Sequence, residues 1–146
     1  MESRLDERIV PPLKWSLFLF VLLTACGLAG NYFRYEIFFS FQYIFGSIFA
    51  LLVLQFLGFR RGVAAAFLIS LMTYKIWNHP YAIVIMTAEA AVVGLLQRRR
   101  NIGLVLADAI YWLFIGIPLV FLFYYGLMHL PFSSVSVSMM KQALNG

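Results

Sequence analysis

Charged residues are scarce in this chain of 146 residues. They make up 12% of it, about half the share found in soluble globular domains. Hydrophobic residues make up 63%, and the mean hydropathy is +0.89. A soluble domain of this length cannot bury so much apolar surface. The composition therefore excludes an ordinary soluble domain and predicts a protein whose main solvent is lipid.

Cysteine and histidine are also scarce. Cys26 is the only cysteine, which excludes an internal disulfide and a metal site built from several cysteines. The two histidines, His79 and His129, are far apart and lack the spacing of metal ligands, so no metal site is predicted. The chain has no glycine-rich nucleotide loop and no nucleophile with a convincing base beside it. We therefore predict no cofactor and no enzyme activity within these residues.

The main feature of the sequence is a series of long apolar runs. They predict an all-α, polytopic transmembrane helical bundle of about five spans within residues 15–125. A span needs about 17–25 residues, so the first, third and fourth runs are at or below the lower limit. Gly116 and Pro118 predict a kink in the last one. The expected spans are residues 15–30, 38–57, 63–76, 81–97 and 102–125.

The basic residues predict how the bundle is oriented. If the five runs all span, eight of the eleven Lys and Arg residues lie on one side of the membrane and three on the other. The side richer in Lys and Arg is normally cytoplasmic, so residues 1–14 are expected in the cytoplasm. Residues 126–146 then form an extracytoplasmic segment that leads to a further span. The net charge of +5 is explained by this placement and not by a nucleic-acid partner.

Two acidic residues lie inside the expected spans. Glu89 precedes the cluster Arg98-Arg99-Arg100 and Asp108 follows it, each about eight residues away. At 1.5 Å rise per residue, both lie about 12 Å from the same membrane surface. A short basic turn makes the two helices antiparallel neighbours, so the carboxyl groups could meet. An acid at this depth is costly and marks a candidate functional site.

Three interpretations of the two acids are open. They could be structural and hydrogen-bond to Thr87, Tyr111 or Trp112. They could instead reach along their helices to the arginine cluster. In the third interpretation they form a proton or cation site in which the two carboxyl groups titrate together. The last interpretation makes Glu89, Asp108, Tyr111 and Trp112 the candidate site.

A second group of candidate residues lies in the loops of the opposite face. Arg34, Glu36, Lys75, Asn78 and His79 could bind a small polar ligand together with nearby tyrosine and tryptophan side chains. The alternative is an aromatic belt at the membrane surface, where Tyr, Trp, Lys and Arg collect. Lys75 and His79 are four residues apart and would share a helical face if the helix continued to Pro80.

Several strings resemble the N-terminal membrane regions of bacterial multidomain signalling proteins. The strings are residues 31–39, 45–49, 78–82, 89–100, 108–120 and 141–146. The layout is similar to that of the membrane-associated sensor group and, more loosely, to the substrate-binding components of vitamin transporters. The resemblance implies an input domain in the bacterial cytoplasmic (inner) membrane, followed in a longer protein by a histidine kinase or diguanylate cyclase output. It assigns no ligand-binding residues.

We therefore expect a membrane-embedded sensory domain that passes a ligand or protonation signal to a cytoplasmic output domain. The expected partners are the lipid bilayer, a small ligand or proton, and a second copy of the chain if the output is a kinase or cyclase. The alternative is a small-molecule binding or transport subunit that resembles a vitamin-uptake component.

Overall fold

The computed structural model describes residues 12–33, 35–36, 42–43 and 45–145, and these residues are almost entirely helical. The exception is one antiparallel pair of two-residue strands, β1 (Tyr35–Glu36) and β2 (Gln42–Tyr43). The helices are α1 (Leu13–Tyr32), α2 (Gly46–Leu57), α3 (Phe59–Trp77), α4 (Tyr81–Arg100), α5 (Leu104–Tyr111), η1 (Trp112–Gly116), α6 (Ile117–Phe121), η2 (Leu122–Leu127) and α7 (Phe132–Asn145). The predicted all-α fold is thus confirmed for the described residues.

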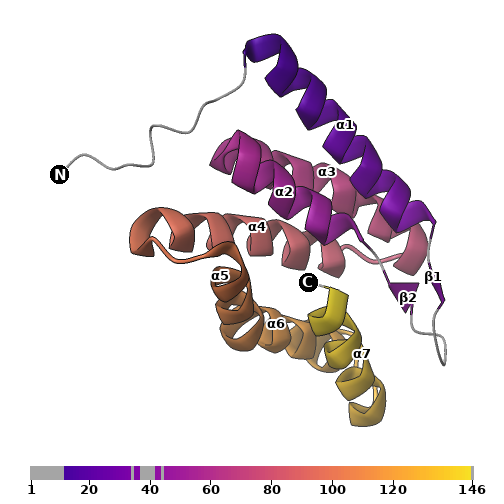
Figure 1. Ribbon diagram of the computed structural model, residues 1–146. Helices are drawn as coiled ribbons and strands as arrows, with labels where there is room; N and C mark the ends of the chain where they lie inside the picture. Colours follow the sequence, from indigo (N-terminus) through magenta and orange to yellow (C-terminus); the bar gives the residue numbers. More distant parts are fainter. Residues whose placement is uncertain (1–11, 34, 37–41, 44, 146) are drawn as a thin grey trace.

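The helices form two groups that share α4. Helices α1 to α4 pack along one another, with α3 in contact with each of the other three. The continuous helical segment Leu104–Leu127 packs on the other side of α4, and α7 folds back against it (Figure 1). One apolar core lies between α1, α2, α3 and α4, and a second lies between α4 and the segment Leu104–Leu127. Helix α4 therefore contributes to both cores.

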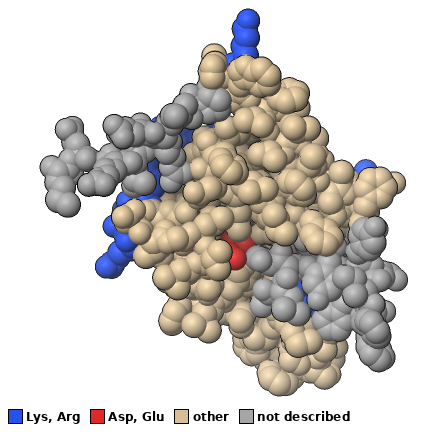
Figure 2. All heavy atoms as spheres, viewed as in Figure 1, with Lys and Arg blue, Asp and Glu red and all other residues tan. Residues whose placement is uncertain are grey.

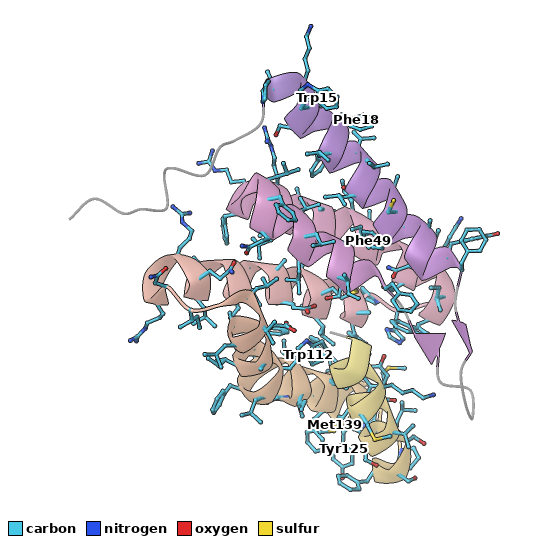
Figure 3. All side chains as sticks on the ribbon, in the orientation of Figure 1. Trp15, Phe18, Phe49, Trp112, Tyr125 and Met139 are labelled. Atoms are coloured by element: carbon cyan, nitrogen blue, oxygen red, sulfur yellow. The ribbon has the colours of Figure 1, made fainter. Side chains whose placement is uncertain are left out.

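Three of these helical segments are long and apolar enough to cross a membrane. They are α1, α4 and Leu104–Leu127. Large apolar side chains on α1 face outward, among them Trp15 and Phe18, which are 63% and 55% exposed (Figure 3). Such a surface suits contact with acyl chains and not with water. The chain is accordingly treated as a membrane protein.

The predicted second span differs most from the structure. A helix was expected over residues 38–57, but α2 begins only at Gly46, and residues 42–43 lie in β2. The side-chain Oδ1 of Asn31 accepts a hydrogen bond from the backbone N–H of Gly46 at 2.9 Å. Asn31 on α1 thus satisfies a free donor in the first turn of α2. At 12 residues, α2 is about 18 Å long.

Small residues let α2, α3 and α4 approach closely. A Cβ atom on Gly62 of α3 would lie 2.5 Å from the Cα of Leu54 in α2, and one on Gly94 of α4 would lie 2.6 Å from Phe59. Ala65 and Ala66 are fully buried on the same face of α3 as Gly62. The region expected as a basic turn over residues 58–62 is tighter than predicted, since α2 ends at Leu57 and α3 starts at Phe59.

The expected kink in the last span takes the form of two π-helical stretches. Pro118 has no N–H to donate and its ring collides with the carbonyl group four residues earlier, so a regular helix cannot continue through it. The turns before it, Trp112–Gly116, are π-helical, and so are the turns Leu122–Leu127 after α6. Such stretches are frequent at functional sites. In Figure 1 the path of the segment changes direction between α5 and α6.

The C-terminal segment forms a helix, α7, that packs against α6 and η2. Val135 in α7 is completely buried. With 14 residues, α7 is about 21 Å long, less than the apolar thickness of a bilayer. In the described residues this helix returns to the bundle and does not extend away from it.

Candidate functional site

Glu89 lies at the centre of the site. It is in the middle of α4, and its side chain is 1% exposed. Its Oε1 accepts a hydrogen bond from Ser47 Oγ in α2 at 2.7 Å and another from Trp112 Nε1 in η1 at 3.3 Å. One carboxyl oxygen therefore connects three helical elements that are far apart in the sequence. Figure 3 shows Trp112 at the junction between α4 and the C-terminal half of the chain.

Asp108 of α5 is the acidic group that interacts with Glu89 across the α4–α5 contact. The two carboxyl groups are close enough to interact electrostatically. An ionised carboxylate can only accept, so a hydrogen bond between them requires a proton on one of them. If both lost that proton, two like charges would face each other away from water, which is strongly unfavourable. A proton shared between the two carboxyl groups would remove this repulsion.

Asp108 is the more accessible member of the pair. Its side chain is partly exposed, whereas that of Glu89 is buried. Its Oδ1 is buried and receives no hydrogen bond from any donor in the part of the chain that the structure describes. Figure 2 shows acidic atoms near the middle of the face in view, with uncharged tan surface next to them. A proton or another small donor could reach the pair through Asp108.

Tyr111 and Trp112 were both candidate hydrogen-bond partners of the acids, and the structure gives this role to Trp112 alone among the described contacts of the two residues. Trp112 donates directly to Glu89. The Tyr111 hydroxyl instead donates to the backbone oxygen of Ile85 at 2.6 Å, and the tyrosine is fully buried. Tyr111 thus fixes α5 against α4 without bonding to either acid. Thr87 does not bond to the acids either, since its Oγ1 has no hydrogen-bond partner among the described residues.

Two residues of the site were missed by sequence reasoning. Ser47 donates the shortest hydrogen bond to Glu89, and the signal for it was a hydroxyl group inside an apolar run. Gly116 leaves room for the indole ring, since a Cβ atom there would lie 2.6 Å from Trp112 Cε3. The glycine had been noted only as a source of a kink.

The arginine cluster does not take part in this site. In the described part of the chain, the groups that act on Glu89 and Asp108 are each other, Ser47 and Trp112. Arg98 instead lies over the ring of Phe59, 5.8 Å from its centre. The interpretation in which the acids pair with the arginine cluster therefore has no supporting contact among the described residues.

The candidate residues of the opposite face are not brought together into one site. Lys75 and Asn78 are exposed. Helix α3 ends at Trp77 and Asn78 is left-handed with φ 55°, so Lys75 and His79 do not share a helical face. The condition for a shared face, a helix that continues to Pro80, is not met because the asparagine ends the helix first. Arg34 and the side chain of Glu36 lie outside the described residues.

His79 is the one residue of this group that joins a cluster. Its ring stacks on Trp77 and contacts Tyr81 and Tyr124, with ring centres 6.2, 5.1 and 5.4 Å away. Its Nε2 lies 3.4 Å from the Tyr124 hydroxyl, and Gln142 of α7 donates to that hydroxyl at 3.0 Å. Burial lowers the pKa of the His79 imidazole below its usual value, which favours the neutral ring. Tyr124 therefore joins the α3–α4 connection to α7.

Replacing Tyr124 with phenylalanine is expected to loosen α7. The change removes a hydroxyl that bonds to both His79 and Gln142. Two lost hydrogen bonds at about 0.5–1.5 kcal/mol each correspond to roughly tenfold faster amide exchange in residues 132–145. Hydrogen exchange with mass spectrometry measures this rate. Tyr125→Phe is the matched control, because Tyr125 is 48% exposed and its described contact is a ring stack with Phe121. Equal exchange in the two variants would contradict the assignment.

The described residues contain no group of three His, Cys, Asp or Glu side chains that could hold a metal ion. His129 is exposed and lies apart from the His79 cluster. Comparison with protein families, with curated proteins and with solved structures finds no match to this chain.

Proposed function

We propose that this chain is a membrane-embedded input domain in which protonation of the Glu89–Asp108 pair changes how the helices pack. The observation that carries the proposal is the single oxygen, Glu89 Oε1, that accepts hydrogen bonds from both α2 and η1. A change in the charge of this carboxyl group alters both bonds at once. In this proposal the helices exchange between two packing states. A signal can shift that exchange only if it binds the two states with different affinities. The two hydrogen bonds to Glu89 would give the proton different affinities for the two states.

The proposal includes a topology of five helical passes with a cytoplasmic N-terminus in a bacterial inner membrane. Helix α2 is shorter than the bilayer core and would require local thinning. The described basic residues near the start of α1, the α2–α3 connection and the end of α4 favour that side as cytoplasmic. In this scheme the packing change passes from Trp112 along α6 and η2 to α7, and from there to an output domain. A second copy of the chain would be needed if that output is a kinase or cyclase.

The test measures the distance between two spin labels in the protein reconstituted in lipid nanodiscs. The labels replace Phe56 of α2 and Val105 of α5, which are 62% and 83% exposed, in a Cys26→Ser background. We expect the distance to change by about 1–2 Å or more between pH 5 and pH 9, as in other helix shifts. The double variant Glu89→Gln, Asp108→Asn should show no such change.

His79→Gln serves as the control, because His79 is a partly buried titratable group outside the acid pair, and a histidine can change its charge between these pH values. That variant should respond to pH as the wild type does. The proposal fails if the double variant still responds, or if the response disappears in His79→Gln alone.

A second candidate function is binding or transport of a small cation or polar molecule at the same pair. The observation that favours it is Asp108 Oδ1, which no described donor satisfies. This function predicts uptake into vesicles that contain the protein, with loss of uptake in Glu89→Gln. An input domain predicts the distance change without uptake.

A further inference from the structure

Six of the eight described cations gather at one end of the bundle. This basic end consists of Lys14 on α1, Arg60 and Arg61 on α3, and Arg98, Arg99 and Arg100 on α4. The two other described cations, Lys75 and Lys141, are near the C-terminal ends of α3 and α7. In Figure 2 blue atoms lie along the left edge and at the top of the view, and they are separate from the acidic atoms in the middle.

Contacts between elements hold these cations together. Arg61 donates a hydrogen bond to Ser16 Oγ, which ties α3 to the start of α1. Arg98 lies over the ring of Phe59, which ties the end of α4 to the start of α3. Gln97, the residue before Arg98, donates to Gln55 at 3.0 Å and ties α4 to α2. These contacts hold together the ends of α1, α2, α3 and α4 on which the cations lie.

The described residues of the basic end offer no acid to balance these charges. Glu89 and Asp108 lie about 12 Å deeper along their helices, and Glu36 lies in β1, beyond the other end of α1. Lys14, Arg60, Arg98, Arg99 and Arg100 are exposed. Several like charges held together repel one another unless a counter-charge is bound.

Exposed apolar side chains lie directly beside the exposed cations. Trp15 follows Lys14 and is 63% exposed, and Leu95, 43% exposed, is one helical turn before Arg99. Phe56, 62% exposed, is at the end of α2. A ligand with a negatively charged group attached to apolar chains would pair with the cations and also cover the apolar side chains. A nucleic acid or a soluble acidic protein would satisfy only the cations.

We propose that the basic end binds the headgroups of anionic phospholipids in the leaflet that contains it. The phosphate groups contact the exposed arginines, and the acyl chains cover Trp15, Phe56 and Leu95. This inference rests on membrane insertion and not on the proposed input function. A basic residue near an anionic membrane surface contributes about 1 kcal/mol, which corresponds to about a fivefold change in lipid affinity.

The test counts bound lipids by native mass spectrometry. The full chain in a neutral detergent is titrated with dioleoylphosphatidylglycerol or with dioleoylphosphatidylcholine. We expect the first lipid to bind more tightly. Arg100→Gln should weaken its binding about fivefold, and the triple variant Arg60→Gln, Arg99→Gln, Arg100→Gln about a hundredfold. No described structural contact depends on these three side chains, so the variants should fold, which circular dichroism checks.

Lys75→Gln is the matched control, since Lys75 is an exposed cation on the other end of α3. It should leave binding of the anionic lipid unchanged. Equal binding of the two lipids by the wild type would overturn the proposal, as would equal losses from Lys75→Gln and Arg100→Gln. Inorganic phosphate at the lipid concentration should not displace the lipid. Complete displacement would mean that the surface takes free phosphate and not a lipid.

Discussion

Replacing Glu89 with alanine is expected to destabilise the bundle more than any other single change considered. The substitution leaves Ser47 and Trp112 without the acceptor that both use, and it removes the partner of Asp108. A buried donor left unsatisfied costs about 1–3 kcal/mol, so the loss from the two donors is about 2–6 kcal/mol. Unfolding of the purified protein, followed by loss of helical circular dichroism on denaturant titration, measures this loss.

Two further variants separate a structural effect from the proposed proton site. Glu89→Gln keeps an acceptor oxygen for Ser47 and Trp112 and adds a donor for Asp108, so its stability should stay within about 1 kcal/mol of the wild type. Thr87→Ala removes a hydroxyl of the same helix that has no hydrogen-bond partner among the described residues, and it should change stability little. If Glu89→Ala proves no more harmful than Thr87→Ala, Glu89 does not hold the three elements together.

The second large effect is expected from Asn31→Ala. Asn31 is completely buried at the end of α1, accepts from the backbone N–H of Gly46, and donates to the backbone oxygen of Ile69 at 3.1 Å. Its loss removes the group that satisfies the start of α2 and leaves an unpaired donor and acceptor. We expect a loss of about 2–4 kcal/mol in the free energy of unfolding, measured by the same titration.

Asn78→Gly is the control for this prediction. Asn78 is an exposed asparagine in the left-handed region with φ 55°, a conformation that glycine adopts without strain.

Gly46→Ala tests the same contact from the other side, because its Cβ would overlap the Asn31 amide. The double variant Asn31→Ala, Gly46→Ala should lose less unfolding free energy than the sum of the losses in the two single variants, since both changes act on one contact. Full additivity would count against a shared role.

Much of the helical arrangement follows from local properties of the sequence. The apolar runs predicted α1, α4 and the last span to within about three residues at each end. These predictions succeed because membrane helices are defined by runs of apolar residues and by a constant rise per residue.

The predictions that failed depended on contacts between distant segments. Residues 38–57 are mostly apolar, and the predicted span did not separate the part before Gly46 from the part after it. That start follows from Asn31, which is 15 residues earlier. Lys75 and His79 were grouped by their spacing alone, whereas the structure places His79 beside Tyr124, 45 residues away.

The sequence by itself determined that this is an all-helical protein with apolar helices long enough to cross a membrane, a basic end, and two acids at a common depth. Composition and helical periodicity are enough for these features, because each depends on neighbours within a turn or a run. Only the tertiary structure decided what the acids touch. Ser47 is 42 residues from Glu89 and Trp112 is 23 residues away. Such partners are selected by helix packing, in which Gly62 lets α3 approach α2 closely and Gly116 leaves room for the Trp112 ring.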